Sequence, residues 1–254
     1  MSRGLSFSHV QRLLERVPDL RGSVLVGGQA LNYWAGQYRI TNYGQALSFD
    51  IDFLGGGAAA EEVALIIGGK VTLADIANPH SPNTALVTTE IDGVVHHIDF
   101  LSSLHGFSIS ELRRVKDWAI EVRPHGGGPT ILVMHPVHCL ESVLENTYGA
   151  ALNRREGPAG VRAAERVRLA IDACRCMALE YLDQARERDA LRIAEKVHAM
   201  SIGGPALRAQ HEDDVDVTRA IPHERMPKAF IDRRWPQLQR VRAQAFARYL
   251  RRRD

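Results

Sequence analysis

The sequence predicts an α+β protein in which a small mixed β-sheet with flanking helices precedes a helical region. Short β-rich runs alternate with helix-like segments as far as about residue 135. An Asp-Gly pair separates two of those runs, as in a hairpin. After Pro136 the periodicity is helical, with Arg- and Glu-rich outer faces. We therefore expect two domains, residues 1–135 and 136–254.

The first domain is expected to begin with a helix over residues 8–17, where apolar side chains share one helical stripe. A buried strand at 23–26 then ends at two glycines and continues as a helix over 29–35. Residues 36–47 contain Gly, Asn and Tyr and are interpreted as a loop. Further strands are expected at 48–54, 70–74, 84–91, 94–101, 119–122 and 130–134, and further helices at 60–67 and 109–116.

The second domain is expected to be helical at 137–148, 160–181, 183–200 and 228–252. Residues 203–226 contain Gly, Pro and an acidic patch, and we expect them to be partly irregular.

Composition is that of an ordinary globular protein, with 45% hydrophobic and 24% charged residues. No apolar run reaches the roughly 20 residues that a membrane-spanning helix needs, and the N-terminus lacks the pattern of a signal peptide. The expectation is a cytoplasmic protein without a membrane partner. The three cysteines, Cys139, Cys174 and Cys176, are interpreted as reduced thiols that act as small hydrophobes.

The net charge of +2 conceals an asymmetry. Residues 1–150 carry 10 Lys and Arg against 15 Asp and Glu, whereas residues 151–254 carry 22 against 15. An acidic half that holds cations and a basic half that holds a polyanion suit an enzyme acting on nucleic acid. Solvated helix faces explain the basic half equally well.

Two glycines mark the first chemical motif. Gly27 and Gly28 stand between a buried strand and a helix, where a phosphate can approach the backbone and meet the N–H groups of the helix start. Tight strand-to-helix turns also use glycine for steric reasons alone.

Two carboxylates mark the second motif. Asp50 and Asp52 alternate with Phe49, Ile51 and Phe53, so a strand would present both acids on one face and the apolar residues on the other. Adjacent carboxylates repel each other unless a cation neutralises them, and hard divalent ions such as Mg²⁺ prefer their oxygens. The alternative is that both acids lie on an exposed polar face of a strand, although aspartate is unfavourable in β-strands.

A third carboxylate, Asp99, lies between Ile98 and Phe100 on a later predicted strand, which we expect beside the strand of Asp50 and Asp52. Three acids there would form a cage for two metal ions. His97 shares the face of Asp99, where a hydrogen-bonded structural role is favoured over metal or phosphate contact.

Together, these motifs resemble the signature of the DNA polymerase β-type nucleotidyltransferase superfamily. VGGQALNYW followed by SFDIDF is most similar to its AbiEii-type branch, which includes toxins of bacterial toxin–antitoxin pairs. The resemblance covers residues 23–101. It implies a nucleotidyltransferase-fold domain at 1–135, with a helical domain at 136–254 for substrate or partner binding.

The resemblance also implies roles for single residues. Asp50, Asp52 and Asp99 would be the catalytic and metal-binding acids, with two Mg²⁺ ions (or Mn²⁺) as cofactors, and Asp99 would act as the base on the attacking hydroxyl. The nucleotide-binding candidates are Gly27, Gly28, Ser48, Arg39 and Arg188. The chain departs from the family pattern at Gly28, which leaves no serine hydroxyl in the glycine motif, and at Arg188-Asp189, a degenerate version of a later motif.

The function expected is transfer of a nucleoside monophosphate from an NTP (ATP, CTP or GTP) to an acceptor hydroxyl, with RNA, especially tRNA, favoured as acceptor. A toxin role with an antitoxin partner is included in that expectation. The alternative is a catalytically inactive module that binds nucleotide, RNA or a partner protein. A third interpretation treats the motif as accidental in an unrelated α+β domain.

Overall fold

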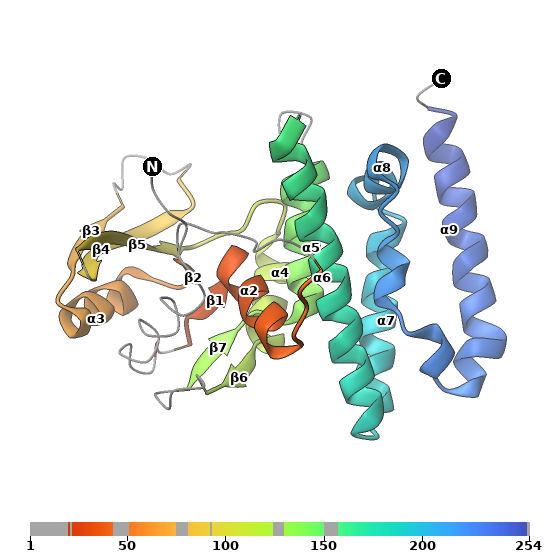
Figure 1. Ribbon diagram of the computed structural model, residues 1–254, viewed down its shortest axis with the longest axis horizontal. Helices are drawn as coiled ribbons and strands as arrows, with labels where there is room; N and C mark the ends of the chain where they lie inside the picture. The colour runs from red at the N-terminus through yellow and green to blue at the C-terminus, as the bar shows by residue number, and fades with distance from the viewer. Residues whose placement is uncertain are drawn as a thin grey trace. The chain divides into compact units, whose positions relative to one another are not determined.

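The computed structural model describes residues 20, 22–42, 51–74, 81–91, 93–123, 130–149 and 157–252. It is an α+β protein with a seven-stranded mixed sheet among these residues (Figure 1). The predicted helix at 8–17 lies outside the described residues, as do Ser48 and Asp50 of the predicted strand 48–54.

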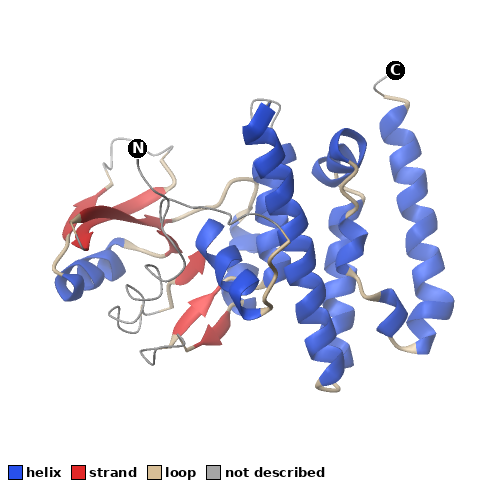
Figure 2. Ribbon diagram, viewed as in Figure 1, coloured by secondary structure: helices blue, strands red, loops and turns tan. Residues whose placement is uncertain are grey.

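The chain divides into two compact units, one of residues 1–34 and 45–139 and one of residues 35–44 and 140–254. The expected boundary at 135/136 lies four residues before the observed division at 139/140. The second unit also contains residues 35–44, which were expected in the first domain. All the described strands belong to the first unit (Figure 2).

The sheet has the order β3-β4-β5-β2-β1-β7-β6. Its strands are β1 (Val24–Val26), β2 (Ile51–Leu54), β3 (Lys70–Leu73), β4 (Asn83–Ile91), β5 (Val94–Leu101), β6 (Ile120–Val122) and β7 (Ile131–Val133). The pairs β2–β5 and β1–β7 are parallel, and the other neighbours are antiparallel. The predicted hairpin is confirmed as β4 and β5, and Gly93 in its turn has a φ of 75°.

The apolar face of the two central parallel strands forms the core of the first unit. Ile51, Phe53, Ile98 and Phe100 are each no more than 1% exposed. The rings of Phe53 and Phe100 stack with centroids 5.6 Å apart. Because alternate side chains of a strand face opposite sides, this packing turns Asp52 and Asp99 toward the other face.

Among the described residues, the first unit contains all or most of α2 (Gly27–Gln37), α3 (Gly57–Ile67) and α4 (Ile109–Trp118). Helix α2 follows β1 directly, and the indole N–H of Trp34 donates to the carbonyl of Met134 at 2.8 Å. Helix α4 begins with a capping box, in which Ser108 and Glu111 satisfy each other's backbone N–H groups. Helix α2 runs two residues further than the predicted 29–35 and starts two residues earlier, at Gly27 itself.

The described part of the second unit contains helices and connecting turns. They are α5 (Pro136–Leu144, which begins in the first unit), a π-helical turn at Glu145–Gly149, α6 (Gly157–Asp183), α7 (Glu187–Ser201), α8 (Gly204–Asp213), short 3₁₀ turns at Val217–Ala220 and His223–Arg225, a π-helical turn at Phe230–Arg234 and α9 (Trp235–Leu250). The regular helix α8 replaces part of the irregular segment expected at 203–226. Pro205 lies in its first turn, where the missing N–H costs nothing.

Several carboxylates in the second unit form ion pairs with arginine or lysine side chains. Glu195 accepts two hydrogen bonds from Arg234 at 2.8 and 2.9 Å. Lys196 contacts Glu141 at 2.5 Å in a partly buried pair. Arg175 contacts Glu224 and also donates to the carbonyl of Ile221 at 3.1 Å. These ion pairs and hydrogen bonds therefore join neighbouring helices and turns of this unit.

The side chains of Cys139 and Cys174 are buried, and burial raises the pKa of Cys174 above its ordinary value. Among the described residues, each helix is too short or too polar to pass through a bilayer.

Candidate functional site

Strand register brings two of the three predicted acids together. In the parallel pair β2–β5, Asp52 lies directly opposite Asp99, flanked by the pairs Ile51–Ile98 and Phe53–Phe100. Paired residues on neighbouring strands point to the same face, and the strands lie about 4.8 Å apart. The two carboxylates therefore leave the sheet side by side. Both side chains are partly exposed.

The predicted glycine turn lies against this acid pair. Val26 pairs with Asp52 in the antiparallel register of β1 and β2, and Gly27 follows with a φ of 65°. A Cβ built on Gly27 would lie 2.5 Å from Oδ2 of Asp52. Only glycine leaves room for that carboxylate while adopting a left-handed backbone at low cost. The start of α2 at Gly27 and Gly28 is thus held next to Asp52.

An amide that sequence reasoning missed orients the second acid. Nδ2 of Asn83 donates to Oδ1 of Asp99 at 3.2 Å. The register of β4 against β5 shifts between Asn83 and Ala85, and this irregularity accompanies the turn of Asn83 toward Asp99. The only sequence signal was a polar residue just before the predicted strand 84–91.

His97 shares the acid face, as alternation along β5 predicts, and is exposed. Its Nδ1 lies 3.4 Å from Oγ1 of Thr88, the residue opposite it on β4. This contact fits the favoured hydrogen-bonded role.

The third predicted acid, Asp50, lies outside the described residues, as does Ser48. Within the described ranges, no group of three or more His, Cys, Asp or Glu side chains is placed to hold a metal ion. Asp52 and Asp99 alone are a donor set of carboxylate oxygens, which suits Mg²⁺ or Mn²⁺. The hydrogen bond from Asn83 resembles the outer contacts that commonly orient metal-binding carboxylates.

The two arginines among the nucleotide-binding candidates, Arg39 and Arg188, belong to the second unit and are exposed. Arg39 lies two residues beyond the end of α2 with a φ of 53°, and its N–H donates to the carbonyl of Gly36 at 3.2 Å. Arg188 lies in the first turn of α7. The neighbouring Asp189 contacts Arg186 at 2.8 Å, so local helix-start contacts account for this part of the degenerate motif. Phosphate binding by either arginine stays a prediction.

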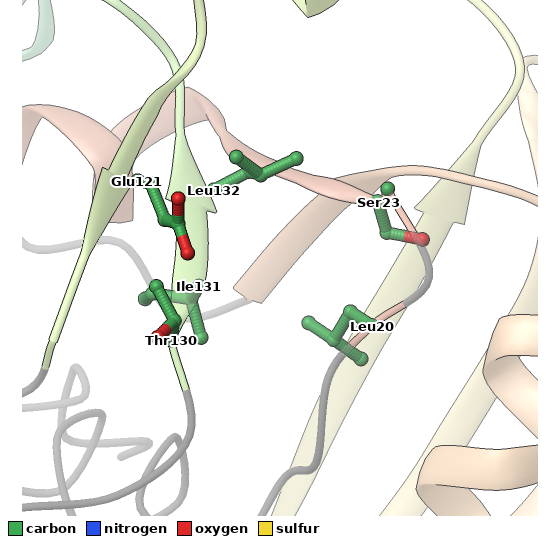
Figure 3. Close-up of a pocket in the computed structure, with 7 residues that line it drawn as sticks. Leu20, Ser23, Glu121, Thr130, Ile131 and Leu132 are labelled. Carbon is green, nitrogen blue, oxygen red and sulfur yellow. The ribbon is translucent and has the colours of Figure 1, made fainter.

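A cavity of about 360 Å³ lies at the amino-terminal end of β1, away from Gly27 (Figure 3). It is lined by Leu20, Gly22, Ser23, Glu121, Thr130, Ile131 and Leu132. These residues precede β1, precede or lie in β7, or lie on β6, whereas Gly27 follows the carboxyl end of β1. The cavity is therefore separate from the acid pair.

No protein-family model matches this chain, and neither a curated protein nor a solved structure matches it significantly.

Proposed function

We propose that this chain is a metal-dependent nucleotidyltransferase that moves a nucleoside monophosphate from an NTP to an acceptor hydroxyl, with RNA as the favoured acceptor. The observation that carries the proposal is the direct register of Asp52 and Asp99 beside Gly27. The resemblance of residues 23–101 to DNA polymerase β-type nucleotidyltransferases, which rests on the same glycines and aspartates, agrees with it. The similarity to the AbiEii-type branch extends the proposal to a toxin neutralised by an antitoxin.

The two carboxylates would hold the cofactor. Asp52 and Asp99, with Asp50 as the third predicted ligand, would bind Mg²⁺, which supplies neutralisation of phosphate charge and activation of the acceptor oxygen. Asn83 would keep the carboxylate of Asp99 in one orientation through its amide. Gly27 and Gly28 would let the triphosphate approach the first N–H groups of α2.

The reaction proposed is a single displacement. The acceptor oxygen bonds to the α-phosphorus as the bond from that phosphorus to the pyrophosphate oxygen breaks. Asp99 would accept the proton of the acceptor hydroxyl, and pyrophosphate leaves with the bonding electron pair. Everything that the chain contributes is therefore positioning, proton acceptance and charge.

A transfer assay tests this. The wild type would be incubated with each α-³²P-labelled NTP, Mg²⁺ and total tRNA or cellular RNA. We expect label transfer that falls about 10³-fold in Asp52→Asn, equivalent to about 4 kcal/mol of transition-state stabilisation. Asp183→Asn is the matched control, since Asp183 is an exposed acid of the helical unit that contacts Arg225 at 2.9 Å. It should retain wild-type activity.

Calorimetry supplies a readout that does not require turnover. Wild type should bind Mg²⁺ with a non-hydrolysable NTP analogue, and Asp52→Asn should lose that binding. Absence of label transfer from the wild type to every fraction, together with metal-independent RNA binding, would replace the proposal with a binding module.

A further inference from the structure

The last helix carries an unusual distribution of charge. From Trp235 to Arg253 the chain contains six arginines and no aspartate or glutamate. Helix α9 spans Trp235–Leu250, and Arg251 continues in a helical backbone conformation. Side chains of this helix form an inner set and an outer set, which lie on different sides.

The inner set is tied to the rest of the helical unit. Arg242, whose side chain is only 12% exposed, contacts Oδ1 of Asp216 and Oε1 of Gln210, at 2.9 and 2.8 Å. Leu238 is 2% exposed. Tyr249 meets the ring of His211 edge-on at 6.0 Å. This side of α9 anchors the helix.

The outer set follows one stripe. Its members are Gln237, Arg240, Gln244, Arg248 and Arg251, at successive spacings of three, four, four and three residues. With 3.6 residues per turn they share one face. All five are exposed. Within the described part of the chain, no carboxylate lies within ion-pair distance of Arg240, Arg248 or Arg251.

The chemistry of this stripe fits a polyphosphate backbone. Guanidinium groups match phosphate oxygens with a planar fork of donors, and glutamine amides donate to phosphate or sugar oxygens. Arg240 and Arg251 are separated by about 17 Å along the axis, at 1.5 Å per residue. That length covers several nucleotides of a strand.

Other polyanionic partners fit less well. Protein interfaces centre on apolar or aromatic residues, and this stripe holds none. A membrane-surface helix inserts an apolar face, but Leu238, on the apolar side of α9, is buried within the unit. Nucleic-acid interfaces, in contrast, are polar and strongly positive.

We infer that the outer stripe of α9 (Gln237, Arg240, Gln244, Arg248 and Arg251) is an RNA-backbone-binding surface. This inference rests on the proposed function, in which the RNA bound at this surface would be the acceptor. Because the stripe offers cations and amides without an aromatic stacking platform, it would bind RNA with little sequence preference.

The test is fluorescence anisotropy with a labelled 20-nucleotide mixed-sequence RNA, single-stranded and as a duplex, in EDTA so that no transfer occurs. The test variant is Arg240→Gln/Arg248→Gln/Arg251→Gln. Loss of three phosphate contacts should weaken single-strand binding about 100-fold at 0.1 M salt and reduce the salt-dependence slope by about 2. The control is Arg113→Gln/Arg114→Gln/Arg162→Gln, which removes the same charge from exposed positions on α4 and α6. It should bind within about threefold of wild type.

Equal weakening by both triple variants would mean that net charge alone attracts RNA, and it would overturn the inference. Unchanged binding in the α9 variant would overturn it as well. Tighter binding of polyglutamate or of anionic phosphatidylserine vesicles than of RNA at this stripe would assign another partner. Asp52→Asn should bind RNA like wild type, so failure of transfer and failure of RNA binding are separable.

Discussion

Two groups of acidic side chains, one in each unit, illustrate different roles of negative charge. In the helical unit, Glu195 contacts Arg234, and Glu141 contacts Lys196. In the sheet unit, Asp52 lies opposite another aspartate, Asp99, which accepts a hydrogen bond from a neutral amide. Acids matched with cations of the chain join elements of the fold. Two acids placed in register concentrate negative charge at one point of a sheet, which is the arrangement that a divalent cation stabilises.

The largest effect is expected from the core beneath the acid pair. Phe100→Ala should destabilise the sheet unit by about 3–5 kcal/mol, because it removes a fully buried ring and its stacking on Phe53. Phe230→Ala, which truncates a ring that is 4% exposed in the helical unit, is the matched comparison. Hydrogen exchange should report lost protection in β2 and β5 for the first variant and in the helices for the second. Equal loss throughout the chain in both would contradict separate cores.

The glycine beside Asp52 should come next. Gly27→Ala places a Cβ 2.5 Å from Oδ2 of Asp52 and requires a φ near 65°. The backbone conformation alone costs about 1–3 kcal/mol, and the close contact adds to it. Gly68→Ala provides the control, since Gly68 has a φ of 70° with nothing within 4 Å.

Chemical denaturation of both glycine variants separates backbone strain from crowding. We expect Gly27→Ala to be the less stable of the two and to lose Mg²⁺-nucleotide binding. Equal stabilities would show that the carboxylate of Asp52 moves aside readily. The close approach of Gly27 to Asp52 would then not be required for function.

Removal of the amide that orients Asp99 should have a smaller effect. Asn83→Ala is expected to reduce metal affinity or activity about 10–100-fold, the usual range for a residue that orients a metal ligand. Asn32→Ala is the control, because Asn32 donates to the neutral amide of Gln29 at the same 3.2 Å. Mg²⁺ titrations of transfer activity measure both. An Asn83→Ala variant with an unchanged Mg²⁺ requirement would count against Asp99 as a ligand.

The smallest effect concerns an ion pair of the helical unit. Hydrogen bonding from Arg234 lowers the pKa of Glu195 below its ordinary 4.5. The pair therefore stabilises the folded protein at pH values above 4.5. This stabilisation is lost as the pH falls through the pKa of Glu195 in the folded state. Because both side chains are more than 40% exposed, we expect Glu195→Gln to cost only about 0.2–1 kcal/mol at pH 7.

Urea denaturation at pH 7 and pH 3 checks this, with 1 M salt as a further condition because salt screens exposed pairs. The difference between wild type and Glu195→Gln should shrink at pH 3. A difference that grows on acidification would reverse the sign expected for a carboxylate with a lowered pKa.

The sequence by itself determined what depends on local periodicity. Alternation around Asp52 and around Asp99 predicted which side chains face the core, and the Asp-Gly pair between residues 91 and 94 predicted the hairpin. Residue spacing also predicted most helices, because a helix buries a stripe that repeats within its own segment. It did not predict α8, where Pro205 was interpreted as a loop signal rather than as a residue of the first turn.

The strand of Asp99 was expected beside that of Asp52, but only the tertiary structure decided the register in which distant side chains meet. Strands β2 and β5 pair directly although β3 and β4 separate them in the chain, and an apolar pattern does not name its partner strand or the register. The contact between Asn83 and Asp99 depends on a local register shift, and the closeness of Gly27 to Asp52 depends on the pairing of β1 with β2. These contacts are non-local. They form because the whole sheet is buried in one register. The sequence around each residue does not indicate which distant residue it will contact.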